Sequence, residues 1–186
     1  PFVHVTDFVE DPMDIPQDQR FKAWGGDYIK NYNFNISPSN QYFTISIFSL
    51  DKDGRARRRK DNFLRTRVIV LDDVKEKLSA EAVERLLPTP SYILETSPGS
   101  EQWGYILDKP CDNRDMVDNL LDGLVSNGLA PDGKDPGMKG VTRYVRLPNG
   151  YNTKKSKMVN GEAFQCRIIT WNPFHTSSME ELSKPF

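Results

Sequence analysis

The chain has 186 residues, a length that suits one compact domain with its own core. Its 26 acidic and 25 basic residues nearly cancel, which excludes binding of nucleic acid through a global positive field. Cys111 and Cys166 lack the paired spacing of a zinc site and indicate buried thiols in a reducing, cytoplasmic protein. No apolar run approaches the roughly 20 residues that span a bilayer, so no membrane partner is expected.

The N-terminal third carries weak structural signals. Residues 1–16 are rich in proline and acids and predict an irregular lead-in. Residues 18–34 predict one or two short helices interrupted by two glycines, and the alternating segment 41–49 predicts a strand. Residues 51–62 are strongly charged and predict a loop.

The middle of the chain is better defined. The apolar run from Val68 to Leu71 is typical of a central strand covered on both faces. Residues 79–88 predict a helix with Ser79 as its N-cap and Pro88 as its stop. Residues 91–107 predict a hairpin that turns at Pro98, Gly99 and Ser100, with Trp103 and Tyr105 packing in the core.

The last third adds one long helix and two short extended segments. Residues 112–128 place apolar side chains at helical spacing. These are Met116, Val117, Leu120, Leu121, Leu124 and Val125. Residues 141–148 and 163–171 predict extended segments, and the capping-box spacing of Ser177 and Glu180 predicts a short closing helix. Strands around two interior helices predict an α+β fold.

Several familiar sites are missing from the sequence. It has no GxxxxGK[ST] phosphate loop and no GxGxxG turn after a strand, so a loop-bound ATP or NAD has no support. It has neither a GxSxG nucleophile elbow nor an HExxH zinc motif. His4 and His175 are the only histidines, and we interpret both as structural.

Two adjacent carboxylates, Asp72 and Asp73, follow the central strand. Like charges about 4 Å apart repel by roughly 4 kcal/mol at an effective dielectric of 20, and a divalent cation reverses that sign. An exposed turn would also accommodate the pair. Because neighbouring side chains on a regular strand point to opposite faces, either the strand bends at this point or one aspartate alone is a ligand. Asp135 is the preferred further ligand, with Asp132 and Glu95 as alternatives.

Basic side chains gather in two segments. In residues 142–155, Arg143, Arg146 and Lys154 alternate with aromatic and amide side chains, including Asn152, as a site for phosphates and bases would require. In an extended segment the two arginines would face opposite sides and need not bind the same phosphate. The RARRRK run at 55–60 is typical of a loop that follows a phosphate backbone, or of a solvated loop.

Taken in order, the blocks RVIVLDDV, PSYILETSPGSEQWGYIL, DPG with TRYVRLPNGYNTK, and CRIITWNP resemble primase domains of the archaeo-eukaryotic primase superfamily. The similarity is to RepB-type plasmid primases and phage primase-polymerases, and it spans about residues 41–182. It implies an α+β fold with an RRM-like mixed β-sheet flanked by helices, and carboxylates that bind Mg²⁺ or Mn²⁺. The sequence places its two acids side by side, whereas the wider superfamily separates them by one residue.

The resemblance also assigns roles to individual residues. The metal-binding and catalytic acids fall on Asp72, Asp73 and Asp135. Gln102 stands where the wider superfamily has a histidine. The nucleotide-binding and DNA-binding side chains are Gln102, Arg143, Arg146, Asn152 and Lys154, with Arg57 and Arg58 from the basic loop.

We therefore expect a template-dependent DNA primase or primase-polymerase, a metal-dependent nucleotidyltransferase of phage or plasmid replication in a bacterial cytoplasm. Its partners would be a DNA template, nucleoside triphosphates and a replicative helicase in the same or another chain. Residues 1–186 would form one catalytic domain, with a lead-in at 1–40 and a core at 41–182, from the N-terminal part of a longer replication protein. The alternatives are a catalytically inactive module that binds single-stranded or origin DNA, and a metal-dependent nuclease.

Overall fold

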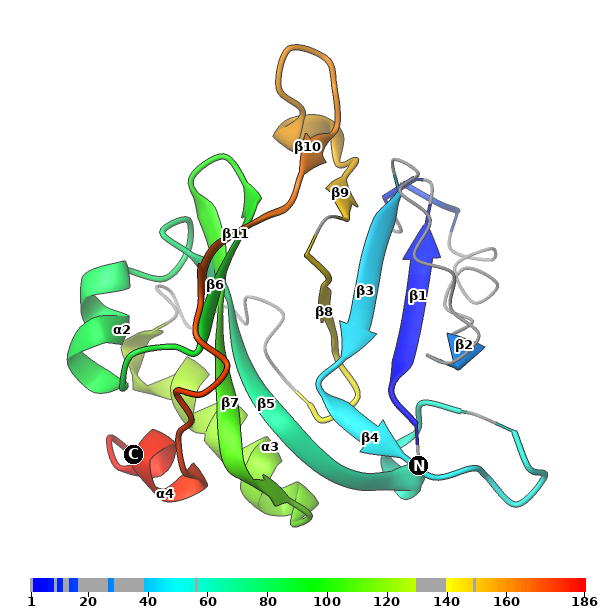
Figure 1. Cartoon of the computed structure of the whole chain (residues 1–186), viewed down its shortest axis with the longest axis vertical. Coiled ribbons are helices and arrows are strands. Elements are labelled where there is room, and N and C mark those ends of the chain that lie inside the picture. Colours follow the sequence, from blue (N-terminus) through cyan, green and yellow to red (C-terminus); the bar gives the residue numbers. More distant parts are fainter. Residues whose placement is uncertain are drawn as a thin grey trace.

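The fold is built on two β-sheets, as seen in a computed structural model. The structure describes residues 2–8, 10–11, 14–16, 27–28, 39–55, 57–129, 140–148 and 150–186. In Figure 1 the helices gather to the left of the larger sheet and the smaller sheet stands to its right. The sequence-based prediction of an α+β class is confirmed.

The larger sheet has five strands in the order β11-β6-β7-β5-β4. Its members are β4 (Ser46–Phe48), β5 (Phe63–Val74), β6 (Tyr92–Ser97), β7 (Ser100–Cys111) and β11 (Arg167–Trp171). All of these neighbours pair antiparallel. Strand β5 lies between β7 and β4 in the sheet, and its apolar run of residues 68–71 pairs with β7, so the predicted central strand and the hairpin β6–β7 are confirmed.

The smaller sheet has four strands in the order β2-β1-β3-β8, again antiparallel. These are β1 (His4–Phe8), β2 (Asp27–Tyr28), β3 (Asn40–Thr44) and β8 (Tyr144–Arg146). The prediction of an irregular lead-in is wrong for residues 4–8, and the predicted helical region contains strand β2. Strand β1 is fixed by pairing with β3, and β2 by pairing with β1, and a local sequence pattern does not report such pairing. The rest of residues 17–38 lies outside the described residues.

The segment 41–49 forms two strands in different sheets, so the prediction of one continuous strand is wrong. The chain leaves β3 at Thr44 and enters β4 at Ser46, with the Ile45 side chain buried in the core. The Thr44 hydroxyl accepts from the His4 backbone N–H at 3.1 Å and donates to the Ser46 carbonyl at 2.9 Å. This side chain therefore satisfies backbone groups at the point where the chain changes sheets.

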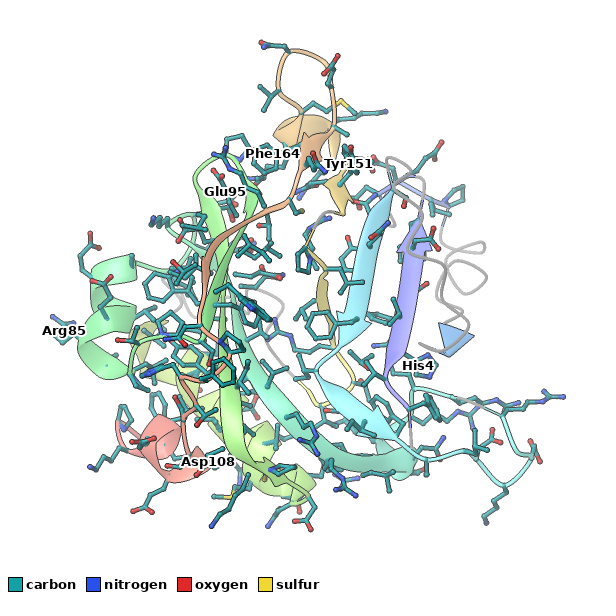
Figure 2. The ribbon with its side chains drawn as sticks, viewed as in Figure 1. His4, Arg85, Glu95, Asp108, Tyr151 and Phe164 are labelled. Carbon is teal, nitrogen blue, oxygen red and sulfur yellow. The ribbon has the colours of Figure 1, made fainter. Side chains whose placement is uncertain are left out.

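A similar break divides the predicted strand 163–171. Phe164–Gln165 forms β10, which pairs with β9 (Tyr151–Asn152) in a small hairpin, and Arg167–Trp171 forms β11. Between them the Cys166 backbone N–H donates to the Gly150 carbonyl at 2.8 Å. Figure 2 shows Tyr151 and Phe164 of this hairpin near Glu95 on β6, at the same end of the molecule. Both cysteines are buried thiols, as predicted.

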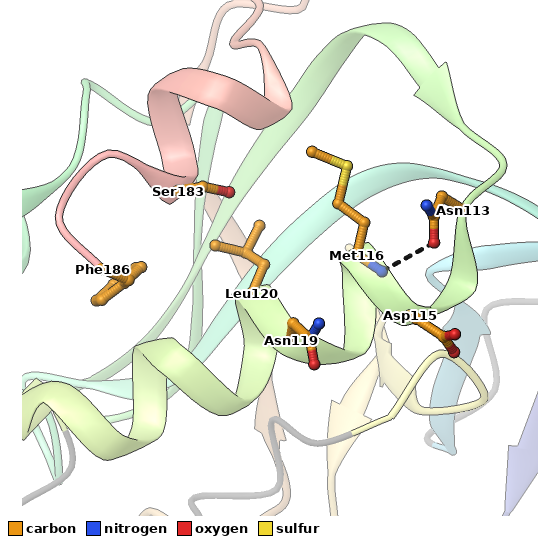
Figure 3. Close-up of a pocket in the computed structure, with 7 residues that line it drawn as sticks. All are labelled: Asn113, Asp115, Met116, Asn119, Leu120, Ser183 and Phe186. Atoms are coloured by element: carbon orange, nitrogen blue, oxygen red, sulfur yellow. Dashed lines mark hydrogen bonds between the residues drawn. The ribbon is translucent and has the colours of Figure 1, made fainter.

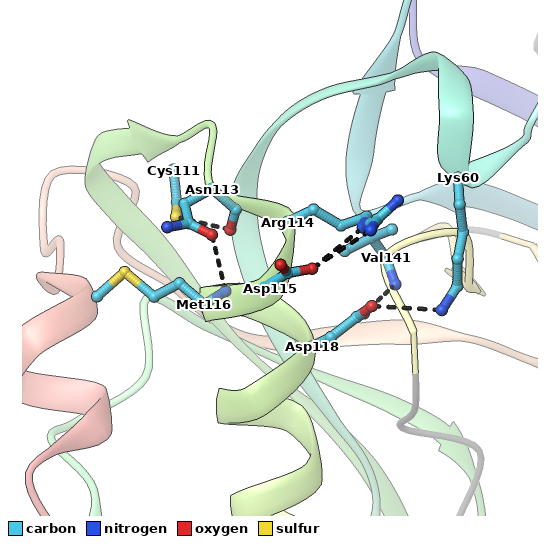
Figure 4. Close-up of polar contacts among 8 residues, drawn as sticks. All are labelled: Lys60, Cys111, Asn113, Arg114, Asp115, Met116, Asp118 and Val141. Carbon is cyan, nitrogen blue, oxygen red and sulfur yellow. Dashed lines mark hydrogen bonds and ion pairs between the residues drawn. The ribbon is translucent and has the colours of Figure 1, made fainter.

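The helices begin where their capping residues stand. Ser79 caps α2 (Ala80–Leu86) by accepting from the Ala82 N–H at 3.3 Å, as predicted. Asn113 accepts from the Met116 N–H at 3.0 Å and so starts α3 (Arg114–Leu124), which continues into a π-helical segment, Val125–Leu129. Asp118 anchors α3 by accepting from the Val141 N–H at 3.1 Å and from Lys60 at 3.3 Å (Figure 4).

The predicted apolar stripe of α3 is buried except at its start. Val117, Leu120, Leu121 and Leu124 lie in the core, and each buried side chain of this size stabilises the fold by about 1.5–3 kcal/mol. Met116 is 41% exposed and lines a surface pocket beside Phe186 and Ser183 (Figure 3). Met116 therefore lies at the surface, at the edge of the apolar stripe.

The closing helix α4 (Met179–Ser183) starts one residue later than predicted. Its capping box joins Ser178 and Glu181, not Ser177 and Glu180. Ser177 instead pairs with strand β7. Its N–H donates to the Ile106 carbonyl at 2.9 Å, and its carbonyl accepts from the Asp108 N–H at 3.0 Å. Remaining short elements are the 3₁₀ turns η2 (Lys60–Asn62) and η5 (Lys155–Lys157). None of the described helices is long and apolar enough to cross a membrane.

Candidate active site

Strand β5 bends at its two carboxylates. The register of β5 against β7 advances three residues from Leu71 to Val74 but two from Trp103 to Glu101, so one extra residue bulges out. Asp73 has a φ of 55°, in the left-handed region that non-glycine residues rarely adopt. Of the two geometries left open by the sequence, the structure has the bent strand.

The backbone around Asp73 holds this conformation in place. The Asp73 carbonyl accepts from the N–H groups of Glu76, Lys77 and Leu78, at 3.1, 2.7 and 3.1 Å. The Asp73 N–H donates to Oδ1 of Asp72 at 3.0 Å. Backbone strain of this kind persists where surrounding contacts determine it, and it concentrates at functional sites.

The Asp72 carboxylate stands in an environment that disfavours its charge. Burial raises the pKa of Asp72, and the neighbouring Asp73 charge raises it further. Arg143 and the hydrogen bond from Gln102 act in the opposite direction. A cation held between the two aspartates would relieve both the burial cost and the repulsion.

Gln102 connects three strands at this point. Its Nε2 donates to Oδ1 of Asp72 at 3.1 Å, and its Oε1 accepts from the Arg146 backbone N–H at 3.1 Å. The side chain is buried, with one end on β5 and the other on β8. Gln102 therefore orients Asp72 in this structure, a contact that the sequence-based assignment to nucleotide binding did not include.

The two arginines predicted to bind phosphate have different surroundings. Arg143 is 6% exposed and donates from Nη1 to the Val70 carbonyl at 2.8 Å, so its charge reaches Asp72 from within the protein. Arg146 donates from Nη1 to Asn40 Oδ1 and to the Tyr151 carbonyl, both at 3.0 Å. Its guanidinium also lies 5.0 Å from the centre of the Tyr42 ring. Their described hydrogen-bond partners differ, in line with the expectation that they need not serve one phosphate.

Asn152 and Lys154 lie on and after β9. Asn152 is buried and donates from Nδ2 to the Thr96 carbonyl at 2.9 Å, which joins β9 to β6. Lys154 is exposed, and its backbone N–H donates to Oδ1 of Asn152 at 3.3 Å. Lys154 therefore combines a fixed backbone with an exposed side chain.

Arg57 and Arg58 of the basic loop are both engaged by the protein. Arg57 forms ion pairs with Asp51 at 3.1 Å and with Asp53 at 3.8 Å. The Arg58 guanidinium lies 4.2 Å from the centre of the Tyr144 ring and donates to the Thr142 carbonyl. The Arg58 contact with Tyr144 attaches the loop to β8, whereas Arg55 and Arg59 are exposed.

Three acids were considered from the sequence as further ligands beside Asp72 and Asp73. Asp135 and its alternative Asp132 lie outside the described residues. Glu95 pairs with Arg167, and it points away from Asp72, because its neighbour Leu94 is the residue opposite Gln102. In the described part of the chain, no three histidine, cysteine or acidic side chains are grouped closely enough to hold a metal ion.

Two residues at the site were missed from the sequence. Lys77 forms an ion pair with Asp73, and its spacing of four residues from that aspartate was the available signal. Asn40 accepts from Arg146 and from the Thr153 N–H at 3.2 Å, and it donates to the Phe8 carbonyl at 3.3 Å. No pattern in the sequence marks Asn40, because its partners come from β1, β8 and the residue after β9.

The fold is that of the archaeo-eukaryotic primase superfamily. It is similar to the primase domain of the cyanophage S-2L primase-polymerase, with 13% identity, a TM-score of 0.58, and 98% of this chain and 88% of that chain covered. It is also similar to the primase RepB′, with 14% identity and a TM-score of 0.56; the match covers 98% of this chain and 55% of that one. No curated protein sequence matches the chain.

The sequence identifies the family within this superfamily. Residues 49–184 match the RepB DNA-primase N-terminal domain, and the chain belongs to that family. A primase role in DNA replication, with DNA as the partner, follows from this membership.

Proposed function

We propose that this domain catalyses template-directed, metal-dependent nucleotidyl transfer, as a primase or primase-polymerase. The observation that carries the proposal is the bulge of β5, which places Asp72 and Asp73 together at the end of a buried strand with their backbones fixed. A plain solvent-exposed turn would not explain why Asp72 accepts a hydrogen bond from Gln102 and interacts with the charge of Arg143.

The residues fit a divalent cation in their chemistry. Two carboxylates are the oxygen ligands that Mg²⁺ and Mn²⁺ prefer, and a cation between them would oppose the burial and the Asp73 charge that raise the pKa of Asp72. When bound, the metal supplies positive charge to the attacking 3′-oxygen and to the α-phosphate. We assign the ligands to Asp72 and Asp73, with Asp135 as a further one.

Other side chains position the substrates. Gln102 holds Asp72 in one orientation. Arg146, fixed by Asn40 and Tyr42, presents a preorganised cation for a phosphate, while the buried Arg143 balances the negative charge of the site. Exposed Lys154 reaches towards the triphosphate or template, and Asn152 fixes the strand that carries it.

The test is primer synthesis on a single-stranded template with labelled nucleotides and Mn²⁺. Asp73→Asn is the sharpest variant, because asparagine keeps the size of the side chain and tolerates the positive φ of this position. We expect Asp72→Asn and Asp73→Asn to abolish synthesis while DNA binding in a chelator persists. The matched control is Asp108→Asn, an exposed carboxylate on β7 (labelled in Figure 2). Unchanged synthesis by Asp73→Asn would remove the assignment.

A non-catalytic DNA-binding module is the second candidate. Lys77 neutralises Asp73 in this structure, and the described residues lack a third ligand beside the pair. This candidate predicts DNA binding without synthesis in the wild-type protein. A metal-dependent nuclease would instead shorten a labelled single strand in a cleavage assay.

A further inference from the structure

Strand β11 exposes apolar side chains along the outer edge of the five-stranded sheet. Ile168 is 45% exposed, Ile169 52% and Trp171 58%. A single exposed apolar residue is ordinary, but three on one strand of five residues form a patch that marks a binding surface.

The register assigns two of these side chains to the face that carries the candidate active site. Ile168 stands opposite Leu94, and Leu94 stands opposite Gln102. Trp171 stands opposite Tyr92, and Tyr92 stands opposite Gly104. Because directly paired residues share a face of the sheet, Ile168 and Trp171 lie on the same face as Gln102, the partner of Asp72.

An aromatic contact connects this edge with the site. The Trp171 and Tyr92 rings have centroids 6.0 Å apart and an interplanar angle of 42°. A Cβ atom at Gly104 would lie 1.9 Å from the Tyr92 ring, so the missing side chain lets that ring extend across β7. The charges of Arg143 and Asp72 both interact with the Tyr92 hydroxyl. The Tyr92 ring therefore lies between Trp171 and the part of the site that contains Asp72.

We propose that Trp171 is a stacking platform for a base of the single-stranded template, a role that rests on the proposed function. Proteins that hold single strands combine positive side chains for the phosphates with exposed aromatic rings for the bases. The face has both, with Arg146 next to Gln102, the partner of Asp72, and Trp171 at the edge.

The test compares two single-stranded oligonucleotides of equal length, one of thymidylates and one with an abasic segment, in a buffer that contains a chelator. Stacking on one aromatic side chain corresponds to a change of about 5- to 150-fold in Kd. We expect Trp171→Ala to weaken binding of the thymidylate strand by a factor in this range and to leave the abasic strand nearly unchanged. Trp171→Phe should restore most of the affinity.

The matched control is Phe186→Ala, which removes an exposed aromatic side chain beside α3, on the helix side of the sheet (Figure 3). It should bind both strands as the wild type does. Equal loss for both strands, or no loss for either, in Trp171→Ala overturns the stacking role. So does a change in oligomeric state of that variant on size-exclusion chromatography, since the edge would then be covered by a second copy.

Failure of this inference is separable from failure of the proposed function. If Trp171→Ala binds normally while Asp73→Asn loses synthesis, the platform is wrong and the catalytic assignment stands. If the wild-type protein makes no primer yet Trp171→Ala still loses the thymidylate strand alone, the platform stands without catalysis.

Discussion

Gln102 and Asp72 lie thirty positions apart in the chain and meet at 3.1 Å, where the Gln102 amide donates to the Asp72 carboxylate. The other end of the same amide accepts from the backbone of Arg146 on the smaller sheet. One side chain thus sets the orientation of a candidate metal ligand and joins the two sheets. Replacing a residue that hydrogen-bonds to a metal ligand commonly changes metal affinity or activity by 10–100-fold, and we expect an effect of about this size for Gln102.

Gln102→Ala should therefore raise the Mn²⁺ concentration needed for half-maximal synthesis by about 10- to 100-fold. The reason is that Asp72 loses its orienting donor while its charge remains. A manganese titration of primer synthesis measures this effect. Gln165→Ala, on the exposed part of β10, is the matched control. An unchanged titration for Gln102→Ala would show that Asp72 is oriented by other groups.

Gly104→Ala should destabilise the domain by about 1–3 kcal/mol or more, because its methyl group would overlap the Tyr92 ring. Gly123→Ala is the milder case. It lies within helix α3, where alanine is favoured by up to about 1 kcal/mol, and its added Cβ would lie 3.3 Å from the partly exposed Phe186 side chain, which can shift slightly. Urea unfolding of the two variants compares them directly. Equal stability would contradict the close packing of Tyr92 over β7.

His4 should make the stability of the domain depend on pH. Its ring is buried beside Phe2 and Phe48, and burial followed by the charge of Arg58 lowers the pKa of His4 to about 4. The unfolded chain takes up the proton near pH 6.5, so the unfolded state binds more protons and stability falls as pH drops from 6.5 to 4. The full effect amounts to about 3 kcal/mol.

His4→Phe should remove most of this loss, because phenylalanine does not titrate. Thermal unfolding at several pH values between 4 and 7 measures the difference. His175→Ala is the control, since it removes the other histidine, which is exposed. A profile for His4→Phe that parallels the wild type would assign the acid sensitivity to other groups.

Arg58 and Arg59 are neighbours in the basic loop with different expected roles. Arg58→Met should cost about 1–3 kcal/mol of stability, because it loses the contact with Tyr144 and the hydrogen bond to Thr142. Arg59→Met should leave stability unchanged and reduce the salt dependence of DNA binding by about one phosphate contact. Unfolding curves and a salt titration separate the two. If Arg58→Met were as stable as the wild type, Arg58 would not be needed for folding, and a role in DNA binding would be indicated instead.

The sequence predicted the elements whose signals are local. The β6–β7 hairpin, the Ser79 cap and the run of residues 68–71 each follow from neighbours within a few positions, and all three are confirmed. Strand β1 and the division of residues 41–49 between two sheets depend on pairing with distant strands. An alternating pattern is the same whether its strand remains in one sheet or crosses into another.

The candidate site shows the same division. Two adjacent acids after an apolar strand were visible as a motif, but the bulge that unites them comes from the register of β5 against β7. The basic loop was visible as a charge run, whereas the attachment of Arg58 to Tyr144 was not, because 86 positions separate the two residues. A sequence shows which residues are charged, but the partner of each charged side chain depends on how distant strands pack.

The left-handed backbone at Asp73 has a consequence for the evolution of this domain. A side chain in that conformation costs roughly 1–2 kcal/mol that glycine would not. A descendant freed from catalysis would thus gain folding stability if glycine replaced the acid at this position. An acid that is kept at this position in spite of its cost in stability is what selection for catalytic activity would maintain.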